Sequence, residues 1–237
     1  MKTIYAVTLS LFAVCLSAAD LPKYWAVHID SVADRATYER LGKQEEEIRR
    51  DLYKAHDVPP LKSWKLETND GTYFSFRGRE SLADFEKPST VPEDVRKELN
   101  QKFAPLEPKI HASLKNHHSE IWQVDNDLTF LPSPAAPKYA RLITEQVKPS
   151  QWDAYNDVMK RVRAALEKNG VALIVFSADY GDGACRYVLL SDKPIDIKTI
   201  AGDDLLRAWR TAVISSSNVE AHARPDLTAG DASKWIQ

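Results

Sequence analysis

Three polar side chains near the C-terminus recur at every second position, the spacing that places side chains on one face of a β-strand. They are Glu220, His222 and Arg224, within the strand-like segment 219–224. Histidine changes its charge near neutral pH and is also a common metal ligand. A strand face that carries it can therefore transfer a proton, hold a metal or haem, or line a small-molecule site.

Polar residues inside other strand-like segments complete this candidate site. In the first of them, the period of two places Tyr24 and His28 on the face opposite Trp25. Polar strand faces with aromatic walls have the usual composition of a small-molecule pocket. The alternative is that the same side chains face water or pair with one another. The expected ligand-binding residues are Tyr24, His28, Tyr139, Arg141, Arg186, Glu220, His222 and Arg224.

No motif assigns a catalytic residue or a metal site. The sequence has no phosphate-binding glycine loop, no zinc-type pairing of Cys or His, no HExxH and no GxSxG. His117-His118 is expected at the end of a helix, where cationic side chains meet exposed carbonyl groups, with a surface metal site as the alternative. Segment 179–183 lacks the carboxylate ladder of a calcium loop and predicts a turn. We predict no cofactor, with haem as the alternative.

The first half of the chain contains the elements that must position Tyr24 and His28. Its signals are β-branched and aromatic runs, helical spacing of apolar residues, and turn residues between them. In order, they predict a strand at 24–29, a helix capped by Asp34, strands at 61–68 and 72–77 around Asp70-Gly71, a helix after Pro92 that Pro105 and Pro108 kink or split, and a strand at 120–125.

The second half repeats this order. Its closing strand also shares residues with the first, because Glu120 precedes Asp127-Leu128-Thr129 and Glu220 precedes Asp226-Leu227-Thr228. A period of roughly 100 to 115 residues is too long for a solenoid repeat and predicts two copies of one small domain. The second set of elements is a strand at 139–147, a helix capped by Ser150, strands at 171–177 and 185–190, a helix from Asp203 or Asp204, and a strand at 219–224.

Each half reads β-α-β-β-α-β, the ferredoxin-like unit, in which helices cover one face of a four-stranded sheet. Two such units in one chain can bury their open faces against each other. The expected fold class is therefore α+β, with two ferredoxin-like βαββαβ repeats packed sheet to sheet as a single-chain α+β barrel.

In its element order, its matched Asp70-Gly71 and Asp182-Gly183 turns and its matched closing strands, the chain resembles the dimeric α+β barrel superfamily over residues 23–229. That superfamily includes cofactor-independent monooxygenases and haem-handling enzymes such as chlorite dismutases. The resemblance rests on no catalytic motif, so it carries over no catalytic residue.

The N-terminal segment has the layout of a secretory signal peptide: Lys2, an apolar stretch at 4–16, and small residues before Asp20. An uncleaved membrane anchor is the alternative. The expected division is a signal peptide at 1–19, a first repeat at 20–131, a Pro-rich linker at 132–137, a second repeat at 138–229 and a C-terminal tail at 230–237.

Charge and cysteine content narrow the function further. The formal net charge is −2 with both signs interspersed, which gives no electrostatic reason to bind nucleic acid or an anionic membrane. Signal cleavage would remove Cys15 and leave Cys185 as a buried, inert thiol.

We therefore expect an exported protein, periplasmic or secreted, that binds a small, partly apolar ligand in a cleft between two sheets. One alternative is a cofactor-independent monooxygenase-like or haem-dependent enzyme. The other is a structural envelope protein. The sequence leaves the ligand, catalysis and the oligomeric state open.

Overall fold

The computed structural model describes residues 21–60, 63–86, 90–131, 139–177 and 184–228. Its strands are β1 (Tyr24–Val32), β2 (Ser63–Thr68), β3 (Thr72–Arg79), β4 (Leu114–Val124), β5 (Tyr139–Val147), β6 (Ala172–Ser177), β7 (Ala184–Ser191) and β8 (Val213–Ala223). Its α-helices are α1 (Arg35–Ala55), α2 (Glu93–Phe103), α3 (Glu107–Ala112), α4 (Trp152–Lys168), α5 (Ile197–Ala201) and α6 (Asp203–Ala212).

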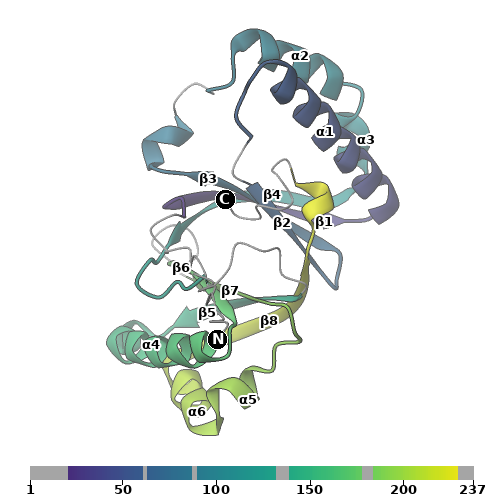
Figure 1. Ribbon diagram of the computed structural model, residues 1–237. Coiled ribbons are helices and arrows are strands. Elements are labelled where there is room, and N and C mark those ends of the chain that lie inside the picture. Colours follow the sequence, from purple (N-terminus) through teal and green to yellow (C-terminus); the bar gives the residue numbers. More distant parts are fainter. Residues whose placement is uncertain (1–20, 61–62, 87–89, 132–138, 178–183, 229–237) are drawn as a thin grey trace, which may run out of the picture.

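The strands form one closed antiparallel barrel in the order β1-β3-β2-β8-β5-β7-β6-β4 (Figure 1). Two short seams join the halves of the chain. At the first, Leu66, Glu67 and Thr68 of β2 pair with Ala223, His222 and Ala221 of β8. At the second, Gln123 and Val124 of β4 pair with Ser177 and Phe176 of β6. Closure satisfies backbone groups that two separate sheets would leave unpaired at their edges.

This barrel corrects the expected fold class. The prediction of two ferredoxin-like βαββαβ repeats packed sheet to sheet is wrong, because the β2–β8 and β4–β6 hydrogen bonds make all the strands one continuous sheet. The barrel therefore has an interior and an outer face, and no cleft between two stacked sheets. The seams join segments far apart in the sequence, so no local pattern reports them.

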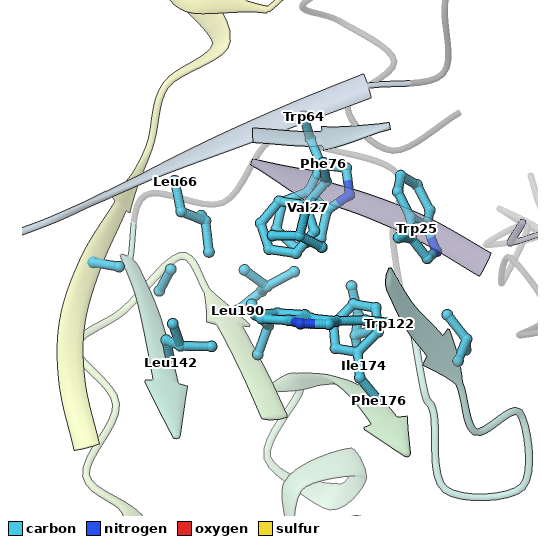
Figure 2. Packing of buried hydrophobic residues seen from close by; sticks show 14 of the residues in the cluster. Trp25, Val27, Trp64, Leu66, Phe76, Trp122, Leu142, Ile174, Phe176 and Leu190 are labelled. Carbon is cyan, nitrogen blue, oxygen red and sulfur yellow. The ribbon is translucent and has the colours of Figure 1, made fainter. Parts of the chain in front are cut away.

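Apolar side chains from all eight strands fill the barrel interior (Figure 2). The ring of Phe76 lies parallel to that of Trp64 with 3.7 Å between centroids, and it meets Trp122 edge-on at 5.5 Å. Trp25 and Val27 of β1 point into the same interior. Burying each of these side chains contributes roughly 1.5–3 kcal/mol relative to leaving it in water, so the interior is the main stabilising core.

Helices cover the outer face of the barrel on two opposite sides (Figure 1). Helices α1 to α3 lie over the strands of the first half, and α4 to α6 lie over those of the second half. Helix α1 begins where predicted, because the Asp34 side chain accepts a hydrogen bond from the backbone N–H of Thr37 at 3.1 Å. The second helix is split as predicted, with α2 ending at Phe103 and α3 beginning at Glu107.

Two predicted boundaries are wrong. His117-His118 lies within β4, although the sequence suggested the end of a helix there. Strand β8 begins at Val213, although the last strand was predicted to begin at 219. Strand β4 begins within two residues of the end of α3, and β8 follows α6 directly. Pairing of β4 with β1 and of β8 with β5 overrides the weak strand propensity of these polar residues.

Several expectations fall outside the described residues. These are the signal peptide at 1–19, the linker at 132–137, the turn at Asp182-Gly183 and the tail at 230–237. In the described part of the chain, no helix has both the length and the apolar character needed to span a membrane. Cys185 is buried in β7 as predicted.

Candidate functional site

A pocket of about 380 Å³ opens between the outer face of β5 and β8 and helices α5 and α6. We call it the Glu145 pocket, after the buried carboxyl group on its wall. Its wall combines aliphatic and aromatic side chains with a few charged groups, the usual make-up of a ligand site. The lining residues are Arg141, Ile143, Glu145, Ile195, Asp196, Ile197, Lys198, Leu206, Trp209, Arg210, Ser216 and Asn218.

Strand β5 places Glu145 on the helix-covered face, in phase with Ile143 and Val147. The carboxyl group, in a residue only 3% exposed, meets three donors from three different elements. Tyr155 Oη of α4 donates to Oε2 at 2.8 Å, and Trp209 Nε1 of α6 donates to the same oxygen at 2.6 Å. Ser216 Oγ of β8 lies 3.0 Å from Oε1. These contacts fix the position of the carboxyl group.

Burial is the main electrostatic influence on Glu145. It raises the pKa of the carboxyl group to about 7, against the opposing effect of the hydrogen bonds from Trp209 and Ser216. A carboxyl group with a pKa near neutral can both accept and return a proton at physiological pH. Perturbed groups of this kind in a pocket are candidates for functional residues.

Cationic side chains lie around the same pocket. Arg141 is held by Glu220, whose Oε1 accepts from Nη2 at 2.9 Å. Lys198 and Arg210 reach the lining from α5 and α6. Asp196 is turned toward the backbone, where it caps α5 by accepting from the N–H groups of Lys198 and Thr199. The cations are therefore the charges most available to a ligand.

A second pocket of about 200 Å³ adjoins the first, and the two share Arg141 and Ile195. We call it the His222 pocket. It brings together four of the residues expected from the sequence, Tyr139, Arg141, Glu220 and His222. His222 Nε2 lies 3.2 Å from Asn69 Oδ1 across the β2–β8 seam. Of these four, only Arg141 also lines the Glu145 pocket.

The other expected residues lie elsewhere. His28 is on the outer face under α1, where its Nδ1 is 2.8 Å from Ser119 Oγ and burial lowers its pKa. Tyr24 is buried, with Lys23 Nζ 5.3 Å from its ring centroid. Arg186 faces the barrel interior and pairs with Glu120 at 3.0 Å. The polar faces therefore do not meet in one cleft.

Arg224 is part of an ion-pair network on the outer face of the first half. Its guanidinium donates to both oxygens of Glu39, at 2.8 and 2.9 Å, and to Asp226 Oδ1 at 2.9 Å. It also donates to the buried carboxylate of Glu67. These bonds occupy the guanidinium, so its contacts are those of a structural residue.

The sequence analysis missed Glu145, Tyr155 and Trp209. One signal for Glu145 was present, because a carboxylate stands between apolar residues on a single strand face, in phase with Ile143 and Val147. A charged residue in that setting is rarely buried without partners. The partners themselves lie up to 71 residues away in the chain and carry no local signal.

The chemistry of the donors around the Glu145 pocket does not match a haem site. Haem iron takes His, Cys, Met or Tyr as its axial ligand in proteins. None of the described residues that line the Glu145 pocket is of these types. In the described ranges, no group of three or more His, Cys, Asp or Glu side chains is placed to hold a metal ion.

No model of a known protein family matches the chain. No curated protein matches it either.

Solved structures do share its fold. A candidate monooxygenase from Fusobacterium nucleatum has 14% identity and a TM-score of 0.56, with 86% of this chain and 92% of the other covered. A variant of chlorite dismutase from Candidatus Nitrospira defluvii has 9% identity and a TM-score of 0.53, with 93% and 98% covered. A haem-binding protein from Thermus thermophilus has 11% identity and a TM-score of 0.51, with 86% and 92% covered. At these identities the likeness establishes the α+β barrel fold and nothing finer.

Proposed function

We propose that this is an exported protein that binds a small, partly apolar molecule with an acidic group in the Glu145 pocket. The observation that carries the proposal is the 380 Å³ pocket with a buried carboxyl group on its wall and cations around it. Ile143, Ile195 and Trp209 would contact the apolar body of the ligand. Arg141, Lys198 and Arg210 would attract its anionic group.

A second candidate function follows from the state of Glu145. With a pKa of about 7, the carboxylate can accept a proton from a bound ligand and the acid can return it. Loss of that proton would leave a ligand anion, from which a cofactor-independent reaction with O₂ can begin. This candidate agrees with the candidate monooxygenases among the structural neighbours, although their likeness extends to the fold alone.

We derive no step through haem. Haem-binding proteins are among the structural neighbours, but the side chains around the Glu145 pocket offer no axial ligand of the required kind.

A fluorescent anion tests the binding site. The probe 1-anilinonaphthalene-8-sulfonate combines an aromatic body with one sulfonate, the chemistry that the pocket is proposed to take. We expect it to bind the folded protein. Leu206→Trp, which fills the pocket from α6, should weaken its binding about tenfold or more, equivalent to at least about 1.4 kcal/mol. Ala164→Trp, on the exposed face of α4, is the matched control.

If the folded Leu206→Trp variant binds the probe as tightly as the wild type does, the Glu145 pocket is not the binding site. Native mass spectrometry of the protein isolated from its own cells identifies a retained ligand and tests export at the same time. An N-terminus at Asp20 is the expected result, and an intact Met1 segment would contradict signal cleavage.

A further inference from the structure

On the opposite side of the barrel from the Glu145 pocket, the outer face beneath α1 carries rows of polar side chains. Strand register sets the rows: His28, Ser75 and Lys65 lie side by side on β1, β3 and β2, and Arg77 lies beside Ser63 in the next row. These residues share one face because each is an even number of positions from the next on its strand. Lys65 and Arg77 are diagonal neighbours, which places their Cβ atoms within about 8 Å.

The two cations in these rows have no anionic partner in contact. Within the described part of the chain, neither Lys65 nor Arg77 makes a side-chain hydrogen bond or ion pair. Lys65 Nζ lies 5.6 Å from the ring centroid of Tyr38. Burial lowers the pKa of both groups, and the nearby guanidinium of Arg77 lowers that of Lys65 further. Both side chains are partly buried. A charge removed from water without a partner is costly, so a partner supplied from solution would stabilise the fold.

These cations line a small chamber of about 30 Å³ under α1. Its wall also contains two buried oxygen atoms without a hydrogen-bond partner, Ser63 Oγ and Glu46 Oε2. The other oxygen of Glu46 accepts from Arg49 Nη1 at 2.5 Å. Glu46 is 9% exposed, so its unpaired oxygen cannot readily turn to bulk water. The chamber has room for about two water-sized groups.

The unpaired groups specify what an occupant must offer. Lys65 and Arg77 need acceptors and favour a negative charge, whereas Glu46 Oε2 needs a donor. Chloride and formate offer acceptors only, and a water molecule offers no charge. Bicarbonate offers acceptor oxygens, one negative charge and one hydroxyl donor.

Other ionisable groups face the chamber and set its charge. Glu46, Asp30 and Glu45 favour the charged form of Lys65. Arg49 and Arg79 add positive charge beside Arg77, and His28 and Tyr53 lie in the same layer. The carboxylates partly offset the cations, so a single negative charge is the most that the layer favours. That balance argues against phosphate, which is both larger and more highly charged near neutral pH.

We propose that the chamber formed by Glu46, Ser63, Lys65 and Arg77 binds a small oxyanion that carries its own hydroxyl group, with bicarbonate as the fitting member of that class. The oxyanion accepts from Lys65 and Arg77, and its hydroxyl group donates to Glu46. This site is independent of the Glu145 pocket, which lies under the other helix layer. The bound oxyanion would connect Glu46 of α1 to Lys65 of β2 and Arg77 of β3 through hydrogen bonds.

Thermal unfolding in the presence of different sodium salts tests the proposal. The full-length protein is heated at equal ionic strength near pH 8 in bicarbonate, formate, chloride or gluconate, where bicarbonate keeps its single negative charge. We expect bicarbonate to raise the unfolding temperature above the value in the other three salts. Equal unfolding temperatures in bicarbonate, formate and chloride would overturn the proposal.

Three variants make the test specific. Arg77→Met should weaken binding. The bicarbonate concentration that gives half of the maximal rise in unfolding temperature should increase about tenfold, equivalent to about 1.4 kcal/mol. Lys115→Met removes an exposed cation of β4 and is the matched control, with no change expected. Glu46→Gln replaces the unpaired acceptor by an amide that can donate, so formate should then stabilise the protein as well as bicarbonate does. A Glu46→Gln protein that keeps the preference for bicarbonate would contradict the assignment.

A direct binding measurement on the wild-type protein tests the site even if the variants do not fold. Line broadening of ¹³C-bicarbonate by the wild-type protein should be reversed by excess unlabelled bicarbonate and less effectively by formate. No broadening by the folded wild-type protein would overturn the site.

Discussion

Tyr155 of α4 donates a hydrogen bond of 2.8 Å to the carboxyl group of Glu145 on β5. Tyr38 of α1 donates one of 2.7 Å to Asp30 on β1. In both halves a strand carboxyl group is thus tied to the helix that follows it. The surroundings differ: Asp30 also contacts His117 Nδ1, whereas Glu145 lines the Glu145 pocket. Glu145 is therefore the carboxyl group that can reach a ligand.

Glu145→Gln should change how stability depends on pH. The folded pKa of about 7 lies above the unfolded value of about 4.5. The stability linked to this proton is therefore fully present below about pH 4.5 and is lost as the pH rises through about 7, up to roughly 3 kcal/mol. Glutamine carries no charge and keeps one acceptor oxygen for Tyr155 and Trp209, while its amide N–H can donate to Ser216 Oγ. Its variant should therefore lose less stability between pH 5 and pH 8.

Urea unfolding of both proteins at the two pH values measures this difference. Glu167→Gln, which changes an exposed carboxylate of α4, is the control and should behave as the wild type does. Equal losses in the wild type and in Glu145→Gln would show that the carboxyl group is ionised over the whole range.

Tyr155→Phe should raise the pKa of Glu145 above about 7. The phenol donates to the carboxylate, and its loss disfavours the charged form. The free energy of unfolding should also fall by about 1 kcal/mol. A ¹³C titration of the glutamate side chains by NMR gives the pKa directly. A decrease in the pKa would contradict the role assigned to this hydrogen bond.

Arg224→Ala should destabilise the protein by about 3 kcal/mol at neutral pH, because the carboxylate of the buried Glu67 loses a partner. Arg224 holds the pKa of Asp226 at about 2 and that of Glu39 well below its usual range. Stability from such groups is present above about pH 4 and is lost as the pH falls through the folded pKa values. The difference in the free energy of unfolding between the wild type and Arg224→Ala should therefore become smaller at acidic pH.

Chemical unfolding at a series of pH values gives this gap. Arg224→Lys keeps the charge without the paired donors, so its free energy of unfolding should lie between those of the wild type and Arg224→Ala. A gap that stays constant from neutral pH to pH 3 would exclude the electrostatic explanation.

Phe76→Ala should lower the free energy of unfolding by about 4 kcal/mol, since it leaves a cavity in the centre of the barrel. The ring is 0% exposed and is stacked on Trp64. Phe85→Ala removes a partly exposed ring outside the barrel and should cost much less. Similar losses for the two variants would mean that the interior is not the main core.

Local signals in the sequence predicted the individual elements well. Asp34 capped α1 as expected, Pro105 and Pro108 separated α2 from α3, and Gly71 adopts the positive φ of 81° that its hairpin turn requires. These outcomes depend on backbone sterics and on hydrogen bonds between residues close in sequence. The period of two likewise separated Tyr24 and His28 from Trp25, but it did not show that the face with Trp25 lines a barrel interior.

The tertiary structure decided the rest. Closure depends on pairs such as Glu67 with His222, and the position of the pocket depends on Trp209 and Ser216 meeting Glu145. The sequence by itself determined which segments become strands and helices, because those preferences act over a few residues. Only the folded barrel decided which polar groups meet and which become buried, because the free energies of pairing and burial depend on contacts between residues far apart in the chain.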